Sequence, residues 1–564
     1  IGKSIAIVLD GMVYSFPRVN TEITGGQSSI SGQFTIEEAE DLANVLKSGK
    51  LPAPATIIQE QVVGPSLGSE SINAGMISFV LAFFLVLLYM IFFYKGAGVV
   101  ADIALLCNVL FLFGALASFG AVLTLPGIAG LVLTLGMAVD ANVIIYERVK
   151  EELRAGKALR LAIADGYKNA YSAIIDGNLT TIITGIVLFF FGSGPVQGFA
   201  TTLVVGIITS MVTSIFITRL IFEARLSRGK NISFYTNMTK NFLANTNIDF
   251  MKMRKKAYVI SGVILIGLIV CIFTKGFTMG VDFAGGRTYV VRFDKPVTAE
   301  QVREATVAEF NETVEVKQFG GESQMKITTK YKINESGNEI DAEIEGKLYN
   351  ALKDMFATEL SIADFTSTLD NPNGIISSDK VGPTVAKDIQ RDAVIAVILA
   401  IIAIFGYIAI RFKGWKWGLG GALSTVHDAI FVIGFFSLFS GILPFNLDVD
   451  QTFIAAVLTI IGYSINDSVV IFDRIREYTV LYPKRELYQN INEALNSTLA
   501  RTINTSGSTI IVMLAIAIFG GDVIRGFAVA LLVGILVGTY SSIFIGTPIM
   551  YDLNERAAKK ALKK

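Results

Sequence analysis

The sequence predicts a polytopic α-helical membrane protein with two pseudo-symmetric transmembrane bundles and small α/β domains outside the membrane. Of its 564 residues, 52% are hydrophobic and 17% are charged, and the mean hydropathy is +0.57. An ordinary soluble protein is less apolar than this. Apolar stretches long enough to cross a hydrocarbon core of ~30 Å recur along the chain, and the two halves repeat the same motifs.

Eleven apolar stretches fit a membrane span of roughly 20 residues. They lie near residues 72–94, 97–119, 126–146, 174–191, 197–222, 257–275, 390–411, 417–440, 452–472, 505–519 and 525–550. An odd number of spans places the two ends of the chain on opposite sides of the membrane. Because Ile1 stands midway into an α/β domain, we expect a further N-terminal portion with a twelfth span.

Basic residues in the connections predict the orientation. The connection after Glu147 and the stretch 223–256 are rich in Lys and Arg, whereas the turns that begin at Gly120, Gly192 and Gly441 contain none. The first group is therefore expected in the cytoplasm together with the basic C-terminal tail. The second group, and the first residues of the chain, are expected on the outer side.

Residues 1–68 have the pattern of a small α/β domain. Two alternating runs flank Asp10-Gly11, which predicts a β-hairpin. A helix is expected to follow, because Thr35 and Glu38 have the spacing of a capping box.

Residues 276–388 repeat this theme. The run from Arg287 is strand-like, Thr298 to Gln301 is a second capping box, and the run from Lys347 is helical. The predicted organisation is an outer α/β domain at 1–68, a five-span bundle at 69–222, a cytoplasmic linker at 223–256, a single span at 257–275, a second outer α/β domain at 276–388, a second five-span bundle at 389–550 and a basic cytoplasmic tail at 551–564.

The two halves of the chain share motifs in the same order. VGPS at Val63 and VGPT at Val381 each precede a five-span bundle. GMAVDANVIIYERVKEE from Gly136 matches GYSINDSVVIFDRIREY from Gly462. Matched segments lie on the same side of the membrane, so we expect a parallel repeat with a pseudo-twofold axis along the membrane normal.

The repeated motif places acids inside two predicted spans. Asp140 aligns with Asn466, while Asp467 is displaced by one position. A charged side chain at this depth costs about 2.5–3.5 kcal/mol on insertion scales, so it must face a partner or a water-filled cavity. Proton binding is one interpretation of the two acids, and a structural hydrogen bond at a helix contact is the alternative.

Arg501 is the expected partner of the two acids. Its counterpart in the first half is Ala173, so one cation would face two carboxylates. A nearby guanidinium favours the ionised form of an acid that burial disfavours, so movement of the Arg would drive proton release or uptake. The alternative is that Arg501 extends to lipid phosphates or caps the cytoplasmic helix end.

Other polar residues support this candidate relay. Glu147 and Asp473, each followed by an Arg, are either the cytoplasmic proton exit or ordinary charged helix ends, and we favour the second interpretation. His427 beside Asp428 is a further candidate for proton relay, although Cys107 and Asn108 stand at the matching positions of the first half. Polar packing around the acids is assigned to Asn142, Asn466, Ser468, Thr505 and Ser506, and a hinge role to Asp282, Gly285, Gly286, Gly382 and Pro383.

Some motifs do not occur in the sequence. No G-x-x-x-x-G-K-[ST] stretch is present, so the chain is not expected to hydrolyse ATP or to be an enzyme. One histidine and two cysteines give no recognisable zinc spacing, and Cys107 and Cys271 lie in apolar spans, so no metal, organic cofactor or disulfide framework is expected. Protons are the expected coupling ion.

VDANVIIYERVKEE, INDSVVIFDRIRE, GVDFAGG and ARTINTS together resemble the SecD and SecF family of bacterial protein-export membrane proteins, with both parts joined in one chain. Residues 1 to about 230 are similar to SecD and about 245 to 564 to SecF. The resemblance implies a resistance-nodulation-division (RND) type fold with ferredoxin-like outer domains, in the bacterial inner membrane. Asp140, Asp467 and Arg501 match the positions that carry protons in the family. The family's first span, its Gly-rich Asp motif and much of its first outer domain have no match here.

The resemblance also implies a function and partners. Such proteins use the proton gradient to promote late, outer-face movement and release of secreted chains with the SecYEG translocon, and YajC and YidC are further expected partners. Unfolded secreted polypeptides and the lipid bilayer are the other expected partners, and nucleic acid is not. The alternatives are an RND-type exporter of small molecules or lipids and a non-transporting scaffold for the translocon.

Overall fold

The chain forms two compact units. The computed structural model describes residues 2–9, 12–21, 29–32, 34, 35, 39, 40, 42, 43, 59–244, 246–335, 337–367, 372–443 and 445–562. One unit comprises residues 1–58 with 335–342, and the other comprises 59–334 with 343–564. The smaller unit contains the antiparallel strands β1 (Ile7–Leu9) and β2 (Met12–Ser15), which confirms the predicted hairpin. Asp10-Gly11 and Glu38 of the predicted capping box lie outside the described residues.

The larger unit contains the membrane helices. Among the described residues, eleven helical segments are long and apolar enough to cross a membrane, which is the predicted number. Their elements are α2 (Pro65–Tyr94), α3 (Gly96–Ser118), α4 (Leu125–Ala138), α5 (Asp140–Arg154), α6 (Leu159–Phe191), α7 (Gly194–Val212), the π-helix η1 (Thr213–Ile217), α8 (Thr218–Ser227), α9 (Phe250–Lys275), α14 (Pro383–Arg411), α15 (Trp415–Phe439), α16 (Gln451–Leu481), α17 (Leu487–Phe519), α18 (Asp522–Ser541), the π-helix η3 (Ser542–Gly546) and α19 (Thr547–Leu562).

Several helices extend beyond the apolar stretches that predicted them. α6 begins at Leu159 instead of residue 174, and α17 begins at Leu487 instead of residue 505. The added turns contain charged and polar residues, such as Asp165 and Glu493, so the hydropathy pattern alone excluded them. The reason is physical: a helix does not have to end where the hydrocarbon ends, because its backbone hydrogen bonds are internal.

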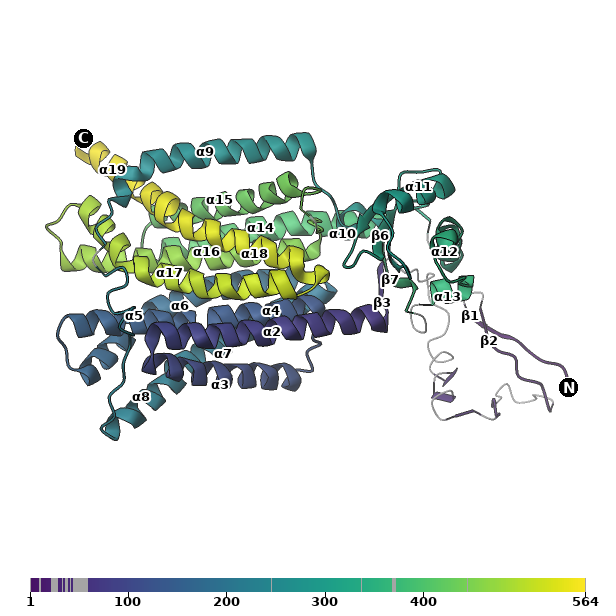
Figure 1. Ribbon diagram of the computed structural model, residues 1–564, viewed down its shortest axis with the longest axis horizontal. Helices are drawn as coiled ribbons and strands as arrows, with labels where there is room; N and C mark the ends of the chain where they lie inside the picture. Colours follow the sequence, from purple (N-terminus) through teal and green to yellow (C-terminus); the bar gives the residue numbers. More distant parts are fainter. Residues whose placement is uncertain are drawn as a thin grey trace. The chain divides into compact units, whose positions relative to one another are not determined.

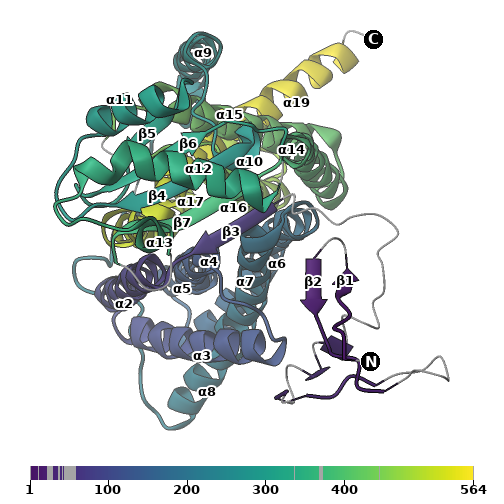
Figure 2. The ribbon, with the colours of Figure 1, turned by 90° about the vertical axis from the view of Figure 1, so that its right-hand side faces the viewer.

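The helices form two groups that correspond to the sequence repeat. α2 to α8 lie together, and α9 and α14 to α19 lie beside them in both views (Figures 1 and 2). α16 packs on α6, α17 packs on α2 and α4, and α14 packs on α6, so the first, third and fourth spans of each five-span bundle face the other bundle. The apolar part of the span Leu125–Arg154 is fully buried inside the protein, and that of the span Gln451–Leu481 is 94% buried. These two spans are therefore central.

A five-stranded antiparallel sheet covers one end of the helix bundle. The strand order is β3 (Gln59–Val63), β7 (Gly374–Val381), β4 (Gly286–Arg292), β6 (Gln324–Thr329) and β5 (Glu315–Gln318). β3 comes from the segment before the first span, yet it pairs with β7 in register Val63 to Ser377. The short α10 (Val281–Ala284) leads into β4, and α11 (Ala299–Phe310), α12 (Asn338–Leu352), η2 (Lys353–Met355) and α13 (Ile362–Thr366) complete this part of the chain.

The predicted local signals of this sheet domain are present. Thr298 and Gln301 form the capping box at the start of α11, and the run from Arg287 is β4. Tyr289 of β4 stands opposite Ile327 of β6, and both side chains are buried. We call this part, β3 to β7 with α10 to α13, the sheet domain, and the helix ends next to it the sheet end of the bundle.

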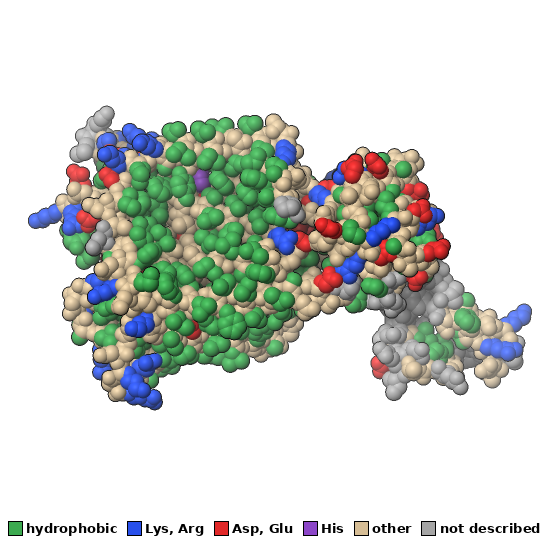
Figure 3. All heavy atoms as spheres, viewed as in Figure 1, with side chains coloured by type: hydrophobic (Ala, Val, Ile, Leu, Met, Phe, Trp, Pro, Cys, Tyr) green, Lys and Arg blue, Asp and Glu red, His purple; other side chains and the backbone are tan. Residues whose placement is uncertain are grey.

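The surface of the bundle fits a membrane protein. Hydrophobic side chains cover its side, Lys and Arg gather toward the end opposite the sheet domain, and Asp and Glu are frequent on the sheet domain (Figure 3). Polar side chains are costly to place against lipid, so the side chains that face the hydrocarbon are apolar.

Candidate functional site

The candidate relay residues come together between the two bundles. Asp140 begins α5, Asp467 lies in the middle of α16, and Arg501 lies in α17. Their relative exposures are 4%, 2% and 5%, so all three are shielded from lipid as expected. The local sequence explains the placement, because Asp450 caps α16 through a 2.8 Å hydrogen bond from the Phe453 N–H and so fixes where that helix starts.

Asp140 has all its side-chain partners in the other half of the chain. Thr505 Oγ1 donates to its Oδ1 at 2.8 Å, and Asn466 Nδ2 donates to its Oδ2 at 2.8 Å. Arg501 Nη2 lies 3.8 Å from Oδ1, which makes a longer ion pair. One carboxylate of the first bundle therefore holds two helices of the second, and its charge state bears directly on how the bundles meet.

Arg501 points into the protein and does not extend to the lipid surface. Within the described residues, no acceptor forms a hydrogen bond with its three guanidinium nitrogens. Asp467 lies within electrostatic range of both Arg501 and Asp140, and its Oδ1 likewise has no hydrogen bond from a described residue. One buried cation thus serves two carboxylates without a close bidentate bond to either. This arrangement allows the guanidinium to favour one acid or the other after a small displacement.

The pseudo-symmetric position of this site has different chemistry. Asn466 occupies the place of Asp140, and Gly177 occupies the place of Thr505. A Cβ atom on Gly177 would stand 1.8 Å from Asn466 Oδ1, so the absence of a side chain here makes room for the amide that holds Asp140. The two halves therefore form one buried site around Asp140, and the pseudo-symmetric position contributes Asn466 to it.

A second symmetric pair of contacts joins the bundles. Tyr89 donates to Asn504 Oδ1 at 3.1 Å, and Tyr407 donates to Asp176 Oδ1 at 2.9 Å. Arg411 adds two Nε contacts of 2.8 Å to the Asp176 carboxylate and an Nη2 contact of 2.7 Å. Asp176 and Arg411 were not among the residues predicted from the sequence. The signal that identifies them is the repeat, since Asp176 aligns with Asn504 and Tyr407 with Tyr89.

Glu147 is the centre of a buried polar cluster. Its Oε1 accepts from Lys150 Nζ at 2.8 Å, from Tyr94 Oη at 3.0 Å and from Asn504 Nδ2 at 3.4 Å. Lys150 is 1% exposed, which is rare for a lysine and is explained by this ion pair. The matching Asp473 pairs with Arg476 at 2.5 Å.

Crossed ion pairs tie the two central spans together at the end opposite the sheet domain. Arg148 Nη2 lies 2.9 Å from Glu477, and Arg474 Nη2 lies 2.8 Å from Glu151. Each Arg thus pairs with the helix of the other half, and the two pairs are related by the repeat. The charged helix ends predicted from sequence therefore form contacts between halves rather than isolated surface charges.

The remaining predicted polar residues are placed differently from one another. Asn142 Oδ1 and Ser468 Oγ are buried without a hydrogen bond from the described residues. Ser506 shares a 2.6 Å hydrogen bond with Thr539. His427 and Asp428 contact each other on α15 and have no direct hydrogen bond to Asp140, Asp467 or Arg501 among the described residues.

The predicted hinge segment contacts the start of α16. Gly285 and Gly286 have φ of +68° and +116°, a region that favours glycine. Asp282, just before them, accepts a 3.3 Å hydrogen bond from the Gln451 N–H, and burial followed by the charge of Asp450 raises the pKa of Asp282 to about 6. Gly382 caps α14 and Pro383 is its first residue, as the fixed φ of proline allows.

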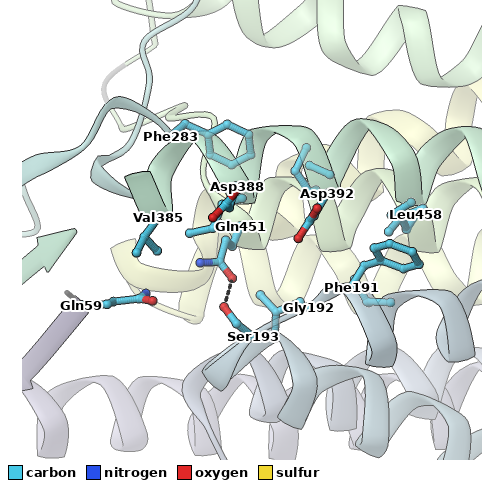
Figure 4. A pocket seen from close by; sticks show the side chains of 16 residues that line it. Gln59, Phe191, Gly192, Ser193, Phe283, Val385, Asp388, Asp392, Gln451 and Leu458 are labelled. Atoms are coloured by element: carbon cyan, nitrogen blue, oxygen red, sulfur yellow. Dashed lines mark hydrogen bonds between the residues drawn. The ribbon is translucent and has the colours of Figure 1, made fainter. Parts of the chain in front are cut away.

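The first residue of α16 also reaches the other bundle. Gln451 Oε1 accepts a 2.8 Å hydrogen bond from Ser193, in the turn between α6 and α7 (Figure 4). The contact borders a pocket of about 180 Å³ whose lining includes Phe283, Asp388 and Leu458. The start of α16 therefore contacts both the predicted hinge segment and the first bundle.

Two lysines attach the sheet to Asp448, in the connection just before α16. Lys317 of β5 lies 2.6 Å from Asp448, and Lys326 of β6 lies 2.9 Å from the same carboxylate. Burial alone would raise the pKa of Asp448, but Lys326 and Lys317 outweigh it and hold that pKa below its usual range. We call this contact of Asp448 with Lys317 and Lys326 the sheet clamp.

A cavity of about 800 Å³ lies between the sheet and the bundle. Its lining includes Asp282, Asp379, Asp450 and Lys326 together with apolar residues such as Phe453. Among the described residues, no three His, Cys, Asp or Glu side chains come together as a set of metal ligands.

Comparison with known proteins agrees with this architecture. The family model "Protein export membrane protein SecD/SecF, C-terminal" matches residues 45–226 and 362–556, which is more than half of the chain. The chain belongs to the SecD/SecF family. The SecDF P1 head subdomain matches residues 1–53, and the SecD/SecF GG motif matches 272–297, where Gly285 and Gly286 lie.

Relatives in this family share nearly the whole chain. It is 36% identical to the protein translocase subunit SecDF of Brucella abortus over 97% of its own length and 69% of that protein, and 37% identical to SecDF of Thermus thermophilus over 100% and 73%. A crystal structure of SecDF from Thermus thermophilus, described as a translocon-associated membrane protein, matches with a TM-score of 0.80 at 34% identity, covering 98% of this chain and 72% of that one. The predicted RND-like fold and an accessory role in protein export are thereby confirmed, and the chain is a multi-pass membrane protein.

Proposed function

We propose that this SecD/SecF chain uses the proton gradient across the bacterial inner membrane to promote the late, outer-face movement and release of secreted polypeptides. The energy comes from protons and not from a nucleotide. In this proposal the sheet end of the bundle faces outward, and the end with the basic residues faces the cytoplasm.

The observation that carries the proposal is the buried site around Asp140. A structural salt bridge inside a membrane protein forms close bonds, as Arg411 does with Asp176. Arg501 instead lies 3.8 Å from Asp140, with Asp467 also in range of its charge. Two carboxylates that compete for one loosely held cation have unequal and changeable proton affinities, which is what a relay needs.

The route from proton binding to movement runs along α16. Asp467 lies in this helix, Asp282 accepts a hydrogen bond from its first residue, and the sheet clamp binds Asp448 just before it. A small displacement of α16 at Asp467 is therefore carried to the sheet domain, because a packed helix moves as a unit. The polypeptide to be exported would contact the moving sheet domain on the outer side of the membrane.

The expected partner is the SecYEG translocon, with YajC and YidC as further partners. Support comes from the related Thermus thermophilus protein, which is described as translocon-associated. Unfolded secreted polypeptides are the expected substrates.

The proposal is tested by export into inverted membrane vesicles that contain the translocon. Asp140→Asn and Asp467→Asn keep hydrogen-bonding capacity but do not carry a proton, so we expect export stimulated by the gradient to be lost while ATP-driven export remains. Asp388→Asn is the control, since its side chain is 54% exposed at the sheet end of α14. Wild-type stimulation in either relay variant, with the protein folded, would exclude that carboxylate as an obligatory proton carrier.

A further inference from the structure

The only histidine of the chain is part of a second buried polar group. His427 Nδ1 lies 2.9 Å from Asp428 Oδ1 on α15, and their relative exposures are 6% and 0%. Ser541 of α18 donates to Asp428 Oδ2 at 2.7 Å, and Ser464 of α16 donates to the same oxygen.

The donors define the chemistry of this group. Two hydroxyls and one imidazole nitrogen converge on one carboxylate, which is the arrangement that stabilises an anion. α9, α14, α16, α18, α19 and η3 pack on α15, and none of their described Lys, Arg, Asp or Glu side chains forms an ion pair with His427 or Asp428. The neighbouring titratable group is Tyr540 of α18, whose ring centroid lies 6.2 Å from the imidazole and whose hydroxyl bonds Ser261 of α9.

Electroneutrality then requires a proton. With one shared proton the pair is an imidazolium and a carboxylate with no net charge. Without that proton it is a neutral imidazole beside a carboxylate, which leaves a net negative charge inside the bilayer. An unbalanced charge at this depth costs about 2.5–3.5 kcal/mol or more, so binding and release of one proton are linked to the surroundings of the pair.

The first bundle shows that helix packing does not need these ions. Cys107 and Asn108 stand at the matching positions of α3, and Asn108 is 1% exposed. In the matched motifs Ala138 takes the place of Ser464. The acid, its histidine and the Ser464 donor therefore occur together in one bundle only, at a crossing that the other bundle makes with uncharged side chains.

The pair connects two elements that bear on function. Ser464 precedes Asp467 by one helical turn on α16. Ser541 comes directly before the π-helix η3, and a Cβ on Gly420 of α15 would stand 2.7 Å from the Gly546 carbonyl oxygen, so α15 and η3 pack backbone to backbone. π-Helical turns inside α-helices are frequent at functional sites, and η1 occupies the equivalent place in the first bundle.

We propose that His427 and Asp428 form a second proton-binding site, separate from Asp140, Asp467 and Arg501, which takes up and releases one proton. The proton lies between Nδ1 and Oδ1 when bound and passes to water when released. Proton binding stands on the geometry above, while its use in export rests on the proposed function.

The single histidine makes the binding directly measurable. In protein labelled with ¹⁵N-histidine in lipid nanodiscs, both ring nitrogen signals come from this one imidazole, and its protonation is followed against pH by NMR. We expect one reversible protonation step. In Asp428→Asn this step should move to lower pH by about one unit or more, a tenfold loss of proton affinity, because the neighbouring anion is gone. A ring that stays neutral throughout, or a step unmoved by Asp428→Asn, would overturn the site.

Two further arms complete the test. The titration is repeated with choline in place of sodium, and a sodium-dependent step would assign the site to a metal cation and overturn the proton assignment. The double variant His427→Cys with Asp428→Asn copies the first bundle, so it should fold with an unchanged melting temperature. We expect its gradient-driven export to fall at least threefold, and unchanged export would remove the link to export. Wild-type gradient-driven export in Asp140→Asn would instead exclude the proposed function. The NMR evidence for proton binding at His427 would not be affected.

Discussion

Gly177→Ala tests whether the space at Gly177 is needed for the hydrogen bond from Asn466 to Asp140. The added Cβ would stand 1.8 Å from Asn466 Oδ1 and 2.8 Å from its Cγ. Side chains in a close-packed interior do not approach so closely, so Asn466 must move by roughly 1 Å or more. That displacement breaks or lengthens its 2.8 Å hydrogen bond to Asp140.

The energetic cost follows from three terms. Overpacking costs typically about 1–3 kcal/mol. A hydrogen bond between membrane helices is worth about 0.6 kcal/mol on average and up to about 1.7. Alanine gains about 1 kcal/mol over glycine in helix propensity. We therefore expect Gly177→Ala to lower the free energy of unfolding by about 2 kcal/mol and to weaken gradient-driven export.

Thermal unfolding in nanodiscs and vesicle export measure the two effects on the same protein. Gly262→Ala is the matched control, because no atom lies within 4 Å of the Cβ position at this residue of α9. Asn466→Ser is the partner variant. Its shorter side chain removes the clash, so adding Gly177→Ala to Asn466→Ser should cost much less than Gly177→Ala costs alone.

A Gly177→Ala protein as stable and as active as Gly262→Ala would exclude the clash with Asn466. A double variant that loses the sum of the two single effects would do the same, because the clash would then lie elsewhere.

Three further predictions concern the contacts around the relay. The pKa of Asp282 is raised to about 6 in the folded state, so the folded protein gains stability as pH falls from about 6 toward the unfolded value of about 3.9 and lacks that gain above 6. Asp282→Asn should therefore raise the melting temperature at pH 7 and flatten its rise on acidification, and a lower melting temperature at pH 7 would contradict this. Lys317→Gln with Lys326→Gln opens the sheet clamp, and should leave proton flux near wild type while export stimulation falls; an equal loss of both would argue against transmission through the clamp. Asp176→Asn should destabilise the fold by about 1–3 kcal/mol, because Arg411 loses its partner, without stopping proton flux in protein that remains folded, whereas a complete loss of flux would make Asp176 part of the relay.

The fold was largely predictable because membrane helices follow one strong rule. A run of roughly 20 apolar residues has no other stable place than the bilayer, so the number of spans follows from composition. The helix starts at Leu159 and Leu487 were not predictable in this way, because the hydropathy of their polar first turns does not distinguish a helix from a loop. Capping predicts such starts only where the cap residue is typical, as at Thr298.

The sequence predicted which residues lie together at the buried site around Asp140, but not the hydrogen bonds between them. The repeat placed Asp140 and Asp467 at similar depth, and a buried acid requires a cation, which pointed to Arg501. Asn466 was expected only as polar packing, yet it donates directly to Asp140. Sequence spacing gives the face of one helix, whereas this bond depends on how two helices from different bundles are rotated against each other.

The sheet clamp and the Asp176–Arg411 pair show the same limit. Lys317 lies in β5 and Asp448 lies far away in sequence, in the connection before α16, so no local pattern joins them. Asp176 lies in a predicted span but needed its repeat partner Asn504 to be recognised. The sequence thus predicts a contact between the halves only where aligned positions of the two halves carry different residues, as Asp176 and Asn504 do.

Proton transport through the site around Asp140 is tested by measuring proton flux through the purified protein in liposomes that contain a pH-sensitive dye. With a gradient imposed across the liposome membrane, wild-type protein and the Asp388→Asn control should carry protons at equal rates. Asp140→Asn, which removes the one carboxylate that joins Arg501, Asn466 and Thr505, should reduce the flux to that of empty liposomes while the protein stays folded. Wild-type flux in folded Asp140→Asn would contradict the account.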